Sequence, residues 1–305
     1  MGFALIFAGQ GLQHAGMLPW LPDDGPEFET LARTLGANWR ARLADPDAAI
    51  RNAYAQPLLT GLALAAWRRL QDRLPPPQAV AGYSVGELAA FSVAGVFDAA
   101  TALALAVERA ALMDDCARQA APTGLVGVTG LPPGTAATLC QRHGLEIAID
   151  SGGDTLILGG PRAALPAFCA DAETLDARCT PLRVEVASHT HWMHGASQAM
   201  AQRLASVAVH RPLKVLYANA TGRRVLTVDD ARRDLAAQIS QCVRWADCLQ
   251  GITERRVDCV LEIGAGAALS RQWNERYPDI PARSADEFRA VGAIVNWVEK
   301  HTARN

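Results

Sequence analysis

The pentapeptide Gly82-Tyr83-Ser84-Val85-Gly86 places a serine between two glycines, with an apolar run before it and a helical pattern after it. Glycines at these two positions leave room for a sharp turn from a strand into a helix, and such a turn lifts the serine hydroxyl above the edge of the sheet. The pattern therefore predicts a strand, a turn and a helix of an α/β fold, with Ser84 as the candidate nucleophile. Glycine and serine also occur in ordinary turns, so the pentapeptide alone leaves a purely structural alternative open.

Length and charge limit the classes of protein to be considered. The chain has 305 residues, of which 50% are hydrophobic, enough for one large α/β domain or for a large domain with a small one inserted. Its 29 Lys and Arg residues nearly balance its 31 Asp and Glu residues. A chain with so little net charge has no field that attracts nucleic acid or an anionic membrane, so we expect neither as a partner.

The cellular compartment is predicted from the cysteines and from the apolar segments. The seven cysteines are an odd number without a C-x-x-C pair, which is typical of reduced thiols. The N-terminus shows no secretory leader, and no apolar stretch approaches the ~18 residues that a membrane helix needs. We therefore expect a soluble protein of the cytoplasm.

The residues before Ser84 predict the elements that surround the turn. Residues 3–8 form a continuous apolar run typical of a buried strand, and the glycine-rich segment 9–13 follows directly. Such a loop presents backbone N–H groups to a ligand in some proteins and is an ordinary turn in others. Residues 56–73 predict a helix with a wide apolar face, and residues 79–81 a short strand that leads into the turn.

A long helix is expected to begin after the N-cap Asp98 and to continue to about Gln119, and it carries Arg109 on an apolar face. A guanidinium cannot lose its charge on burial, so it needs water or a carboxylate, and its planar fork suits a carboxylate in two-point contact. The carboxylate belongs either to a substrate or to a structural residue such as Glu87. The pattern alone does not choose between them.

Residues 122–187 predict short alternating segments. They are a strand at 125–129, a helix at 133–143, strands at 145–150 and 155–159, a helix at 162–176 and a strand at 182–187. The order β-α-β-β-α-β is that of the ferredoxin-like unit, a compact module that can be inserted in a larger domain. We therefore expect a ferredoxin-like subdomain at 122–187, inserted in a large α/β domain made of 1–121 and 188–305.

Three of the seven histidines lie close together, at His189, His191 and His194. Their H-x-H-x-x-H spacing fits neither the H-E-x-x-H helix nor a structural zinc pattern, and no acidic or cysteine ligand lies within the segment. We expect no metal site, and we expect His191 and His194 to be surface or capping residues. Beyond this segment, buried strands are predicted at 213–218 and 257–263, with helices near 228–239, 245–256 and 287–300.

Six ordered motifs resemble those of the malonyl-CoA:acyl-carrier-protein transacylase family, over essentially the whole chain. From the N-terminus they are Gly9-Gln10-Gly11-Leu12-Gln13 (G-Q-G-x-Q in the family), residues 82–87 (G-H-S-x-G-E), Arg109 with Met113 (R-x-x-x-M), Ser188-His189 (S-H), Gln238 before Val243-Arg244-Trp245 (Q-x(4)-V-x-W) and residues 262–266 (E-[VI]-G-P-G). This resemblance implies a large α/β-hydrolase-like domain with a mainly parallel sheet and an inserted ferredoxin-like subdomain.

Two departures refine the resemblance. Tyr83 stands where members of fatty acid synthesis carry histidine, and Gly160 stands where they usually carry asparagine. The resulting G-Y-S-V-G-E is similar to the epsilon subunit of bacterial malonate decarboxylase, which implies malonyl transfer within that complex. A malonyl transacylase of fatty acid or polyketide synthesis is the alternative.

The family resemblance implies a role for each site residue. Ser84 is expected to be the nucleophile, His189 its general base, and Gln238 the residue whose main-chain carbonyl orients the histidine. The backbone N–H groups of Gln10 and Val85 are expected to stabilise the oxyanion.

The resemblance also implies the substrate and the partners. Arg109 is expected to bind the free carboxylate of malonyl. No cofactor is expected to be permanently bound, since malonyl-CoA is the donor substrate. The expected partner is an acyl carrier protein with a thiol prosthetic group, together with the other malonate decarboxylase subunits in that context.

Two further hypotheses come from other functional classes. The same serine turn occurs in esterases and thioesterases of the α/β-hydrolase type, although Arg109 would have no purpose there for a neutral acyl group. A non-catalytic docking subunit that keeps the fold is the other hypothesis, and the presence of both Ser84 and His189 argues against it.

Overall fold

The central sheet of the computed structural model, which describes residues 2–184 and 186–303, consists of four parallel strands in the order β2-β1-β8-β9. Their bounds are β1 Phe3–Phe7, β2 Ala79–Gly82, β8 Cys259–Ile263 and β9 Ala282–Ser284. The first three are buried along their whole length, which is why the sequence shows continuous apolar runs there. The strands predicted at 3–8, 79–81 and 257–263 are thus confirmed.

The alternation of side chains along β1 divides the core into two layers. Phe3, Leu5 and Phe7 belong to one apolar cluster, whereas Ala4 and Ile6 belong to another on the opposite face of the sheet. This division follows from the two-residue period of a strand. Both faces of the central sheet are therefore covered, as expected for an α/β fold.

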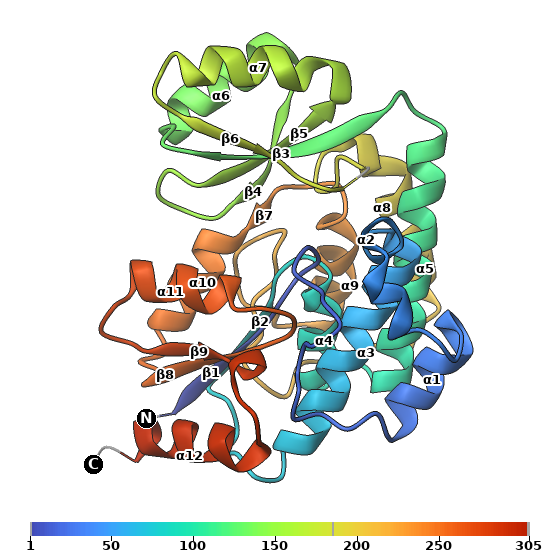
Figure 1. The fold of residues 1–305 in the computed structure, drawn as a ribbon, viewed down its shortest axis with the longest axis vertical. Coiled ribbons are helices and arrows are strands. Elements are labelled where there is room, and N and C mark those ends of the chain that lie inside the picture. Colours follow the sequence, from blue (N-terminus) through green and yellow to red (C-terminus); the bar gives the residue numbers. More distant parts are fainter. Residues whose placement is uncertain (1, 185, 304–305) are drawn as a thin grey trace.

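Helices cover the two faces of this sheet (Figure 1). The larger layer is built around the long helices α3 (Asn52–Leu70) and α5 (Ala99–Arg118), which pack against each other and against α4 (Gly86–Val93). The Asp98 carboxylate accepts a hydrogen bond from the Thr101 N–H, so the predicted N-cap of α5 is confirmed. The remaining helices are α1 Pro26–Leu35, α2 Pro46–Ala49, α8 His194–Ala205, α9 Val228–Ala237, α10 Trp245–Thr253, α11 Ala268–Arg276 and α12 Val291–Thr302, with 3₁₀ turns at Ala41–Ala44, Arg162–Ala164, His191–Met193 and Ala285–Glu287.

A second sheet forms the upper part of the molecule in Figure 1, in the order β6-β3-β5-β4-β7. Its strands are β3 Thr123–Thr129, β4 Glu146–Asp150, β5 Leu156–Pro161, β6 Arg178–Pro181 and β7 Val243–Arg244, and helices α6 Pro133–His143 and α7 Leu165–Glu173 lie above it. The pairs β3–β6, β3–β5 and β4–β5 are antiparallel. The chain thus follows the predicted order β-α-β-β-α-β.

The fifth strand of this upper sheet comes from another part of the chain. β7 pairs in parallel with β4, and it lies outside the segment 122–187. The sheet therefore extends beyond the predicted insertion, and the division into 122–187 and the two flanking segments stays a prediction.

Two predicted strands differ from the structure. The strand expected at 182–187 is absent among the residues described there, and Glu185 lies outside the described residues; β6 at Arg178–Pro181 takes the edge of the sheet instead. β6 is polar and mostly exposed, so it lacks an apolar signal, whereas Leu182, Val184 and Val186 are apolar because they line an internal cavity. The segment expected as a strand at 213–218 runs beside β2 but forms only isolated bridges in the described chain, between Leu216 and Val80 and between Tyr217 and Arg224.

In the part of the chain that the structure describes, no helix combines the length and the apolar character that crossing a membrane requires.

Candidate active site

Ser84 occupies the turn between β2 and α4, and its backbone has a φ of 53°. A Cβ on Gly82 would lie 2.2 Å from the backbone of Gly86, and a Cβ on Gly86 would lie 2.5 Å from the carbonyl oxygen of Phe7. Both glycines are therefore required, because the strand and the helix approach more closely than any side chain allows. The strand, turn and helix predicted around Ser84 are present.

His189 faces the serine hydroxyl. The Ser84 Oγ lies 2.8 Å from His189 Nε2, and His189 Nδ1 lies 2.5 Å from the main-chain oxygen of Gln238. A carbonyl oxygen can only accept, so Nδ1 carries the ring proton of the neutral imidazole and Nε2 is left to accept the proton of the serine hydroxyl. The His189 N–H also donates to the Ile239 carbonyl at 2.8 Å, which anchors the backbone beside the ring. This arrangement matches the geometry expected of a nucleophile and its general base.

Burial lowers the pKa of His189 from 6.5 to about 3, and the positive charge of Arg109 acts in the same direction. The hydrogen bond to Gln238 opposes this shift without reversing it. The imidazole is therefore neutral at physiological pH and able to accept a proton.

The pKa of His189 leads to a prediction about pH. We expect the reactivity of Ser84 toward a fluorophosphonate to persist as the pH falls well below 6.5, because the imidazole gains its proton only near about 3. The unfolded chain takes up that proton below 6.5, so the free energy of unfolding should decrease as the pH falls from 6.5 toward 3. Labelling rates from about pH 4 to about pH 8 would test the first statement, and an acid limb centred near 6.5 would contradict it.

Arg109 is buried in the same cavity and is 2% exposed. Its guanidinium donates to Gln56 Oε1 at 2.7 Å and to Gln238 Oε1 at 3.3 Å, while its Nε has no hydrogen-bond partner within residues 2–184 and 186–303. Among the described residues no carboxylate forms an ion pair with it, Glu87 included. Glu87 still acts on Arg109 through its charge, which raises the pKa of the guanidinium against the larger effect of burial, while the direct hydrogen bonds of Arg109 are to neutral amides. The choice between a structural and a substrate carboxylate for Arg109 stays a prediction.

Gln238 connects the histidine with the arginine. Its main-chain oxygen accepts from His189, whereas its side-chain oxygen accepts from Arg109. The sequence motif predicted the first contact only. Gln56, the other amide that holds Arg109, was missed, because α3 shows it merely as a polar residue within an apolar helix.

Gln10 and Val85 line the same cavity as Ser84. The Gln10 side chain donates to the Ile50 carbonyl at 2.6 Å, which fixes the loop after β1. Within residues 2–184 and 186–303, neither backbone N–H donates to another backbone group. Their expected role as donors to the oxyanion stays a prediction.

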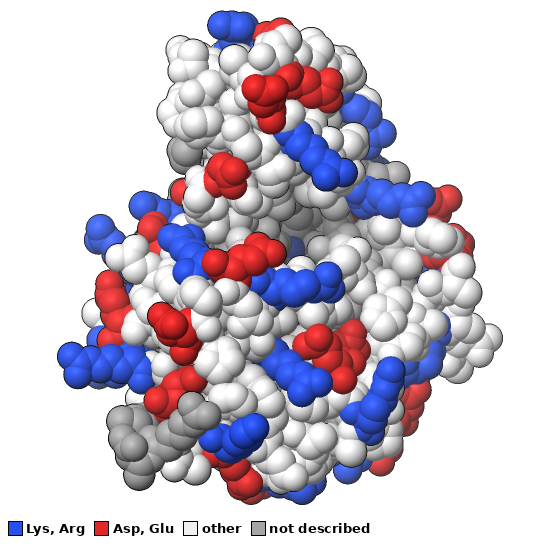
Figure 2. Space-filling view, turned by 60° about the vertical axis from the view of Figure 1, so that its left-hand side comes forward, with Lys and Arg blue, Asp and Glu red and all other residues white. Residues whose placement is uncertain are grey.

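The small cavity at Ser84 opens into a larger groove. The cavity measures about 70 Å³ and the groove about 660 Å³. Residues of both sheets line the groove, and four residues belong to both spaces: Gln10, Tyr83, Ile157 and Leu182. Figure 2 shows a hollow between the upper and the lower part of the molecule, with basic side chains at its rim. The shape fits a short group in the cavity with a long arm in the groove.

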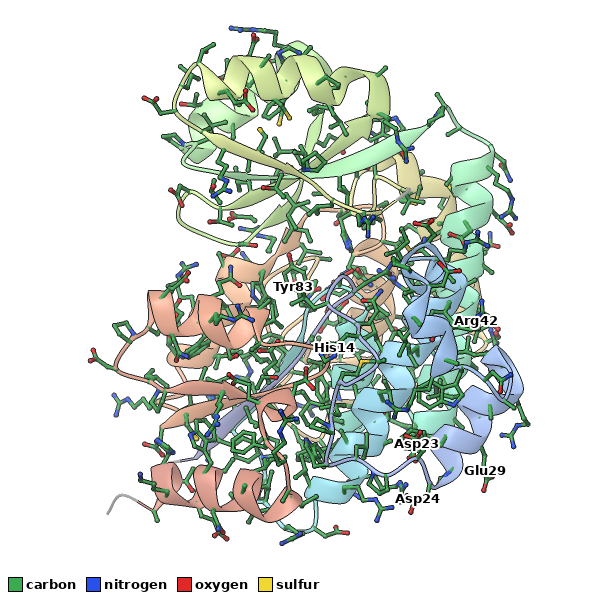
Figure 3. All side chains as sticks on the ribbon, in the orientation of Figure 1. His14, Asp23, Asp24, Glu29, Arg42 and Tyr83 are labelled. Atoms are coloured by element: carbon green, nitrogen blue, oxygen red, sulfur yellow. The ribbon has the colours of Figure 1, made fainter. Side chains whose placement is uncertain are left out.

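Tyr83 marks the junction between groove and cavity. In Figure 3 it lies between the upper sheet and the lower part of the molecule. Its ring packs edge-on against Trp245, with centroids 5.3 Å apart, and burial raises the pKa of its phenol to about 12. Tyr83 thus presents an uncharged aromatic side chain where the groove meets the cavity.

The other two clustered histidines do not line this cavity. His191 Nδ1 lies 2.5 Å from the Glu146 carboxylate, and His194 contacts Gln198. Among the described residues, no group of three or more His, Cys, Asp or Glu side chains forms a cluster that could hold a metal ion.

A serine at a strand-to-helix turn, hydrogen-bonded to a neutral buried imidazole, is typical of enzymes that transfer or hydrolyse acyl groups. Residues 4–296 match the family model of the acyl transferase domain, and this chain belongs to that family of acyltransferases.

Three relatives support the family assignment. A malonyl CoA-acyl carrier protein transacylase of Mycobacterium bovis is 32% identical over 302 residues, covering 96% of this chain and 99% of the relative. The crystal structure of MCAT from Mycobacterium tuberculosis is 29% identical, with a TM-score of 0.84, and covers 97% of this chain and 100% of that one. That of FabD from Acinetobacter baumannii is 26% identical, with a TM-score of 0.88, and covers 97% and 98%. The family resemblance and the α/β fold class predicted from the motifs are confirmed.

Proposed function

We propose that this chain transfers a malonyl group from malonyl-CoA to the prosthetic-group thiol of an acyl carrier protein. The main observation behind the proposal is that one cavity is lined both by the hydrogen-bonded pair Ser84 and His189 and by the buried guanidinium of Arg109. A nucleophile next to a fixed, unpaired positive charge suits an acyl group that ends in a carboxylate. The substrates named in the relatives, malonyl-CoA and an acyl carrier protein, agree with this choice.

In the first half-reaction, the Ser84 hydroxyl attacks the thioester carbonyl of malonyl-CoA while His189 accepts its proton. The tetrahedral oxyanion collapses, the carbon–sulfur bond breaks, and the CoA sulfur leaves with the proton from His189. A malonyl ester of Ser84 remains. In the second half-reaction, the carrier thiol gives its proton to His189 and attacks this ester; the bond between the acyl carbon and Ser84 Oγ breaks, and His189 returns the proton to the serine oxygen. The malonyl thioester of the carrier leaves, so we expect ping-pong kinetics.

The remaining site residues support these two steps. The backbone N–H groups of Gln10 and Val85 donate to the oxyanion, and the Gln238 carbonyl keeps the histidine in the tautomer that accepts at Nε2. Arg109 binds the malonyl carboxylate in two-point contact. The pantetheine arm of either thiol partner would lie in the groove, since the cavity at Ser84 has room only for the acyl group.

The metabolic context is a separate part of the proposal. The relatives carry the name of the transacylase, which supports service to fatty acid or polyketide synthesis over service to malonate decarboxylase. We therefore put the synthetic role first. Malonate decarboxylase remains a second candidate because of Tyr83, whose aromatic ring replaces the histidine of the synthetic enzymes at the groove entrance. The seven cysteines are free, which supports a cytoplasmic location.

Intact-mass analysis after incubation with malonyl-CoA tests the chemistry. We expect a malonyl adduct that maps to the peptide of Ser84 and that disappears when a carrier protein with its thiol is added. Absence of the adduct, with the carrier still bound, would favour a docking subunit. Release of free malonate without a carrier would favour a hydrolase. Comparing carrier proteins of fatty acid synthesis and of malonate decarboxylase as acceptors would separate the two contexts.

A further inference from the structure

Asn219 is fully buried and has a partner for each of its four polar groups, three of them in the turn that carries Ser84 and the start of α4. Its side-chain Oδ1 accepts from the Ser84 N–H at 2.8 Å, and its Nδ2 donates to the Gly82 carbonyl at 2.7 Å. Its backbone N–H donates to Glu87 Oε1 at 2.6 Å, and its carbonyl accepts from the Arg244 N–H at 2.8 Å. The side-chain amide thus bridges the backbone on both sides of Tyr83.

The path of the chain brings Asn219 to this place. The segment before it runs parallel to β2: the Val80 N–H donates to the Val215 carbonyl at 2.8 Å, and the Tyr217 N–H donates to the Val80 carbonyl at 3.0 Å. Asn219 therefore emerges beside the carboxyl end of β2, where the turn begins. The sequence offers one signal for this residue, since Asn219 is a polar residue directly after the predicted buried strand 213–218, but no motif points to its contacts.

The turn needs such a support because its backbone is strained. A φ of 53° at a non-glycine residue persists only when surrounding contacts hold it. The half-buried Ser84 N–H precedes α4 and has no acceptor within that helix, so Asn219 supplies the acceptor that this donor needs. The orientation of the amide is unambiguous, because Ser84 N–H only donates and Gly82 carbonyl only accepts.

We propose that Asn219 is a positioning residue, which holds the Ser84 hydroxyl in line with His189 by clamping the backbone of the turn. Asn219 does not line the cavity, so it acts through Ser84 and not on the substrate. Its Oδ1 also accepts the hydrogen bond of the Ser84 N–H. The next N–H along the turn, that of Val85, is therefore the one that remains to donate to the oxyanion. The inference rests on the proposed role of Ser84 as nucleophile.

Glu87 extends the clamp into α4. Its Oε1 accepts the Asn219 N–H, while its Oε2 has no partner among the described residues. The carboxyl group lies in the first turn of the helix and is completely buried. The turn, the start of α4 and the segment around Asn219 are thereby joined in one hydrogen-bonded unit.

The variant Asn219→Leu tests the clamp, since leucine has a similar size and forms neither side-chain bond. We expect the rate of Ser84 acylation by malonyl-CoA to fall roughly 100-fold, because small displacements of a nucleophile have effects of this order. The KM for malonyl-CoA should stay within about threefold, since Asn219 does not contact the substrate. Single-turnover acylation and steady-state transfer would give both quantities.

Asn274→Leu is the matched control. Asn274 Nδ2 donates to the Ala282 carbonyl at 2.9 Å and its Oδ1 accepts the Ala282 N–H at 2.8 Å, so this asparagine also bridges backbone groups, but between α11 and β9. It lines neither the cavity nor the groove. We expect acylation by this variant to remain within about threefold of the wild type. The proposal is overturned if the rate of Ser84 acylation falls equally in both variants, or if the rate for Asn219→Leu stays within threefold of that of the wild type.

Two further measurements keep the test decisive. If Asn219→Leu does not fold, Asn219→Asp replaces it: the aspartate keeps the acceptor for Ser84 but turns an oxygen toward the Gly82 carbonyl. A decrease of about tenfold or more in the rate of Ser84 acylation supports the proposed clamp, and a smaller decrease overturns it. Fluorophosphonate labelling reads the reactivity of Ser84 without any acyl substrate. If the wild type forms no malonyl adduct, the proposed function fails, while the labelling rates still decide whether Asn219 positions the serine.

Discussion

Replacing Ser84 with alanine is expected to lower acylation by malonyl-CoA by roughly 10⁴-fold or more, since no other group in the cavity replaces the nucleophile. The substitution removes only the Oγ, whose hydrogen bond is to His189. Alanine at a φ of 53° bears about the same strain as serine, so the fold should be retained. Time-resolved intact-mass measurement with malonyl-CoA would give the rate.

Ser92→Ala is the matched control for this experiment. Ser92 lies on the same helix, α4, and does not line the cavity. Its substitution should leave both the adduct and the transfer rate unchanged. A Ser84→Ala protein that still acquired a malonyl group at the wild-type rate would exclude Ser84 as the nucleophile.

Replacing Arg109 with alanine is expected to abolish most of the preference for malonyl over acetyl donors. Leaving the malonyl carboxylate without its buried partner costs about 3–5 kcal/mol, which corresponds to a loss of roughly 10²-fold to 5 × 10³-fold in kcat/KM for malonyl-CoA. Acetyl-CoA has no such carboxylate, so its slow reaction should change little. Competition between the two donors, followed by the mass of the adduct, measures the ratio directly.

Further variants separate the charge of Arg109 from its shape. Arg109→Lys keeps the positive charge but loses the planar fork that contacts Gln56 and Gln238, so we expect an intermediate preference. Arg118→Ala, on an exposed part of the same helix α5, should have no effect. Fluorophosphonate labelling checks that Ser84 stays reactive. An unchanged donor preference in Arg109→Ala would assign the arginine a structural role.

Local stereochemistry explains why the sequence predicted the region around Ser84 well. The close approach of Gly82 to Gly86 is a short-range requirement, so it leaves a pattern in neighbouring positions. Buried strands such as β1 and β8 leave continuous apolar runs for the same reason. An exposed edge strand leaves no such pattern, which is why β6 was placed too late in the chain.

Contacts between distant residues could not be predicted in this way. Gln56 and Asn219 reach their partners across 53 and 135 positions, and no periodicity in the chain encodes such a pairing. The same holds for the choice between a structural and a substrate carboxylate for Arg109. Only the packing of α3, α5 and the segment around Gln238 shows that neutral amides surround its guanidinium.

The sequence by itself therefore determined the α/β class, the family and the serine turn, because glycine geometry, strand burial and ordered motifs are properties of neighbouring residues. The tertiary structure alone decided that the Gln238 and Gln56 side chains accept hydrogen bonds from Arg109, with no direct ion pair to a described carboxylate, and that the Asn219 side chain accepts from the Ser84 N–H. These contacts join β2, α3, α5 and the chain beyond residue 188. They exist only once the folded backbone brings those segments together.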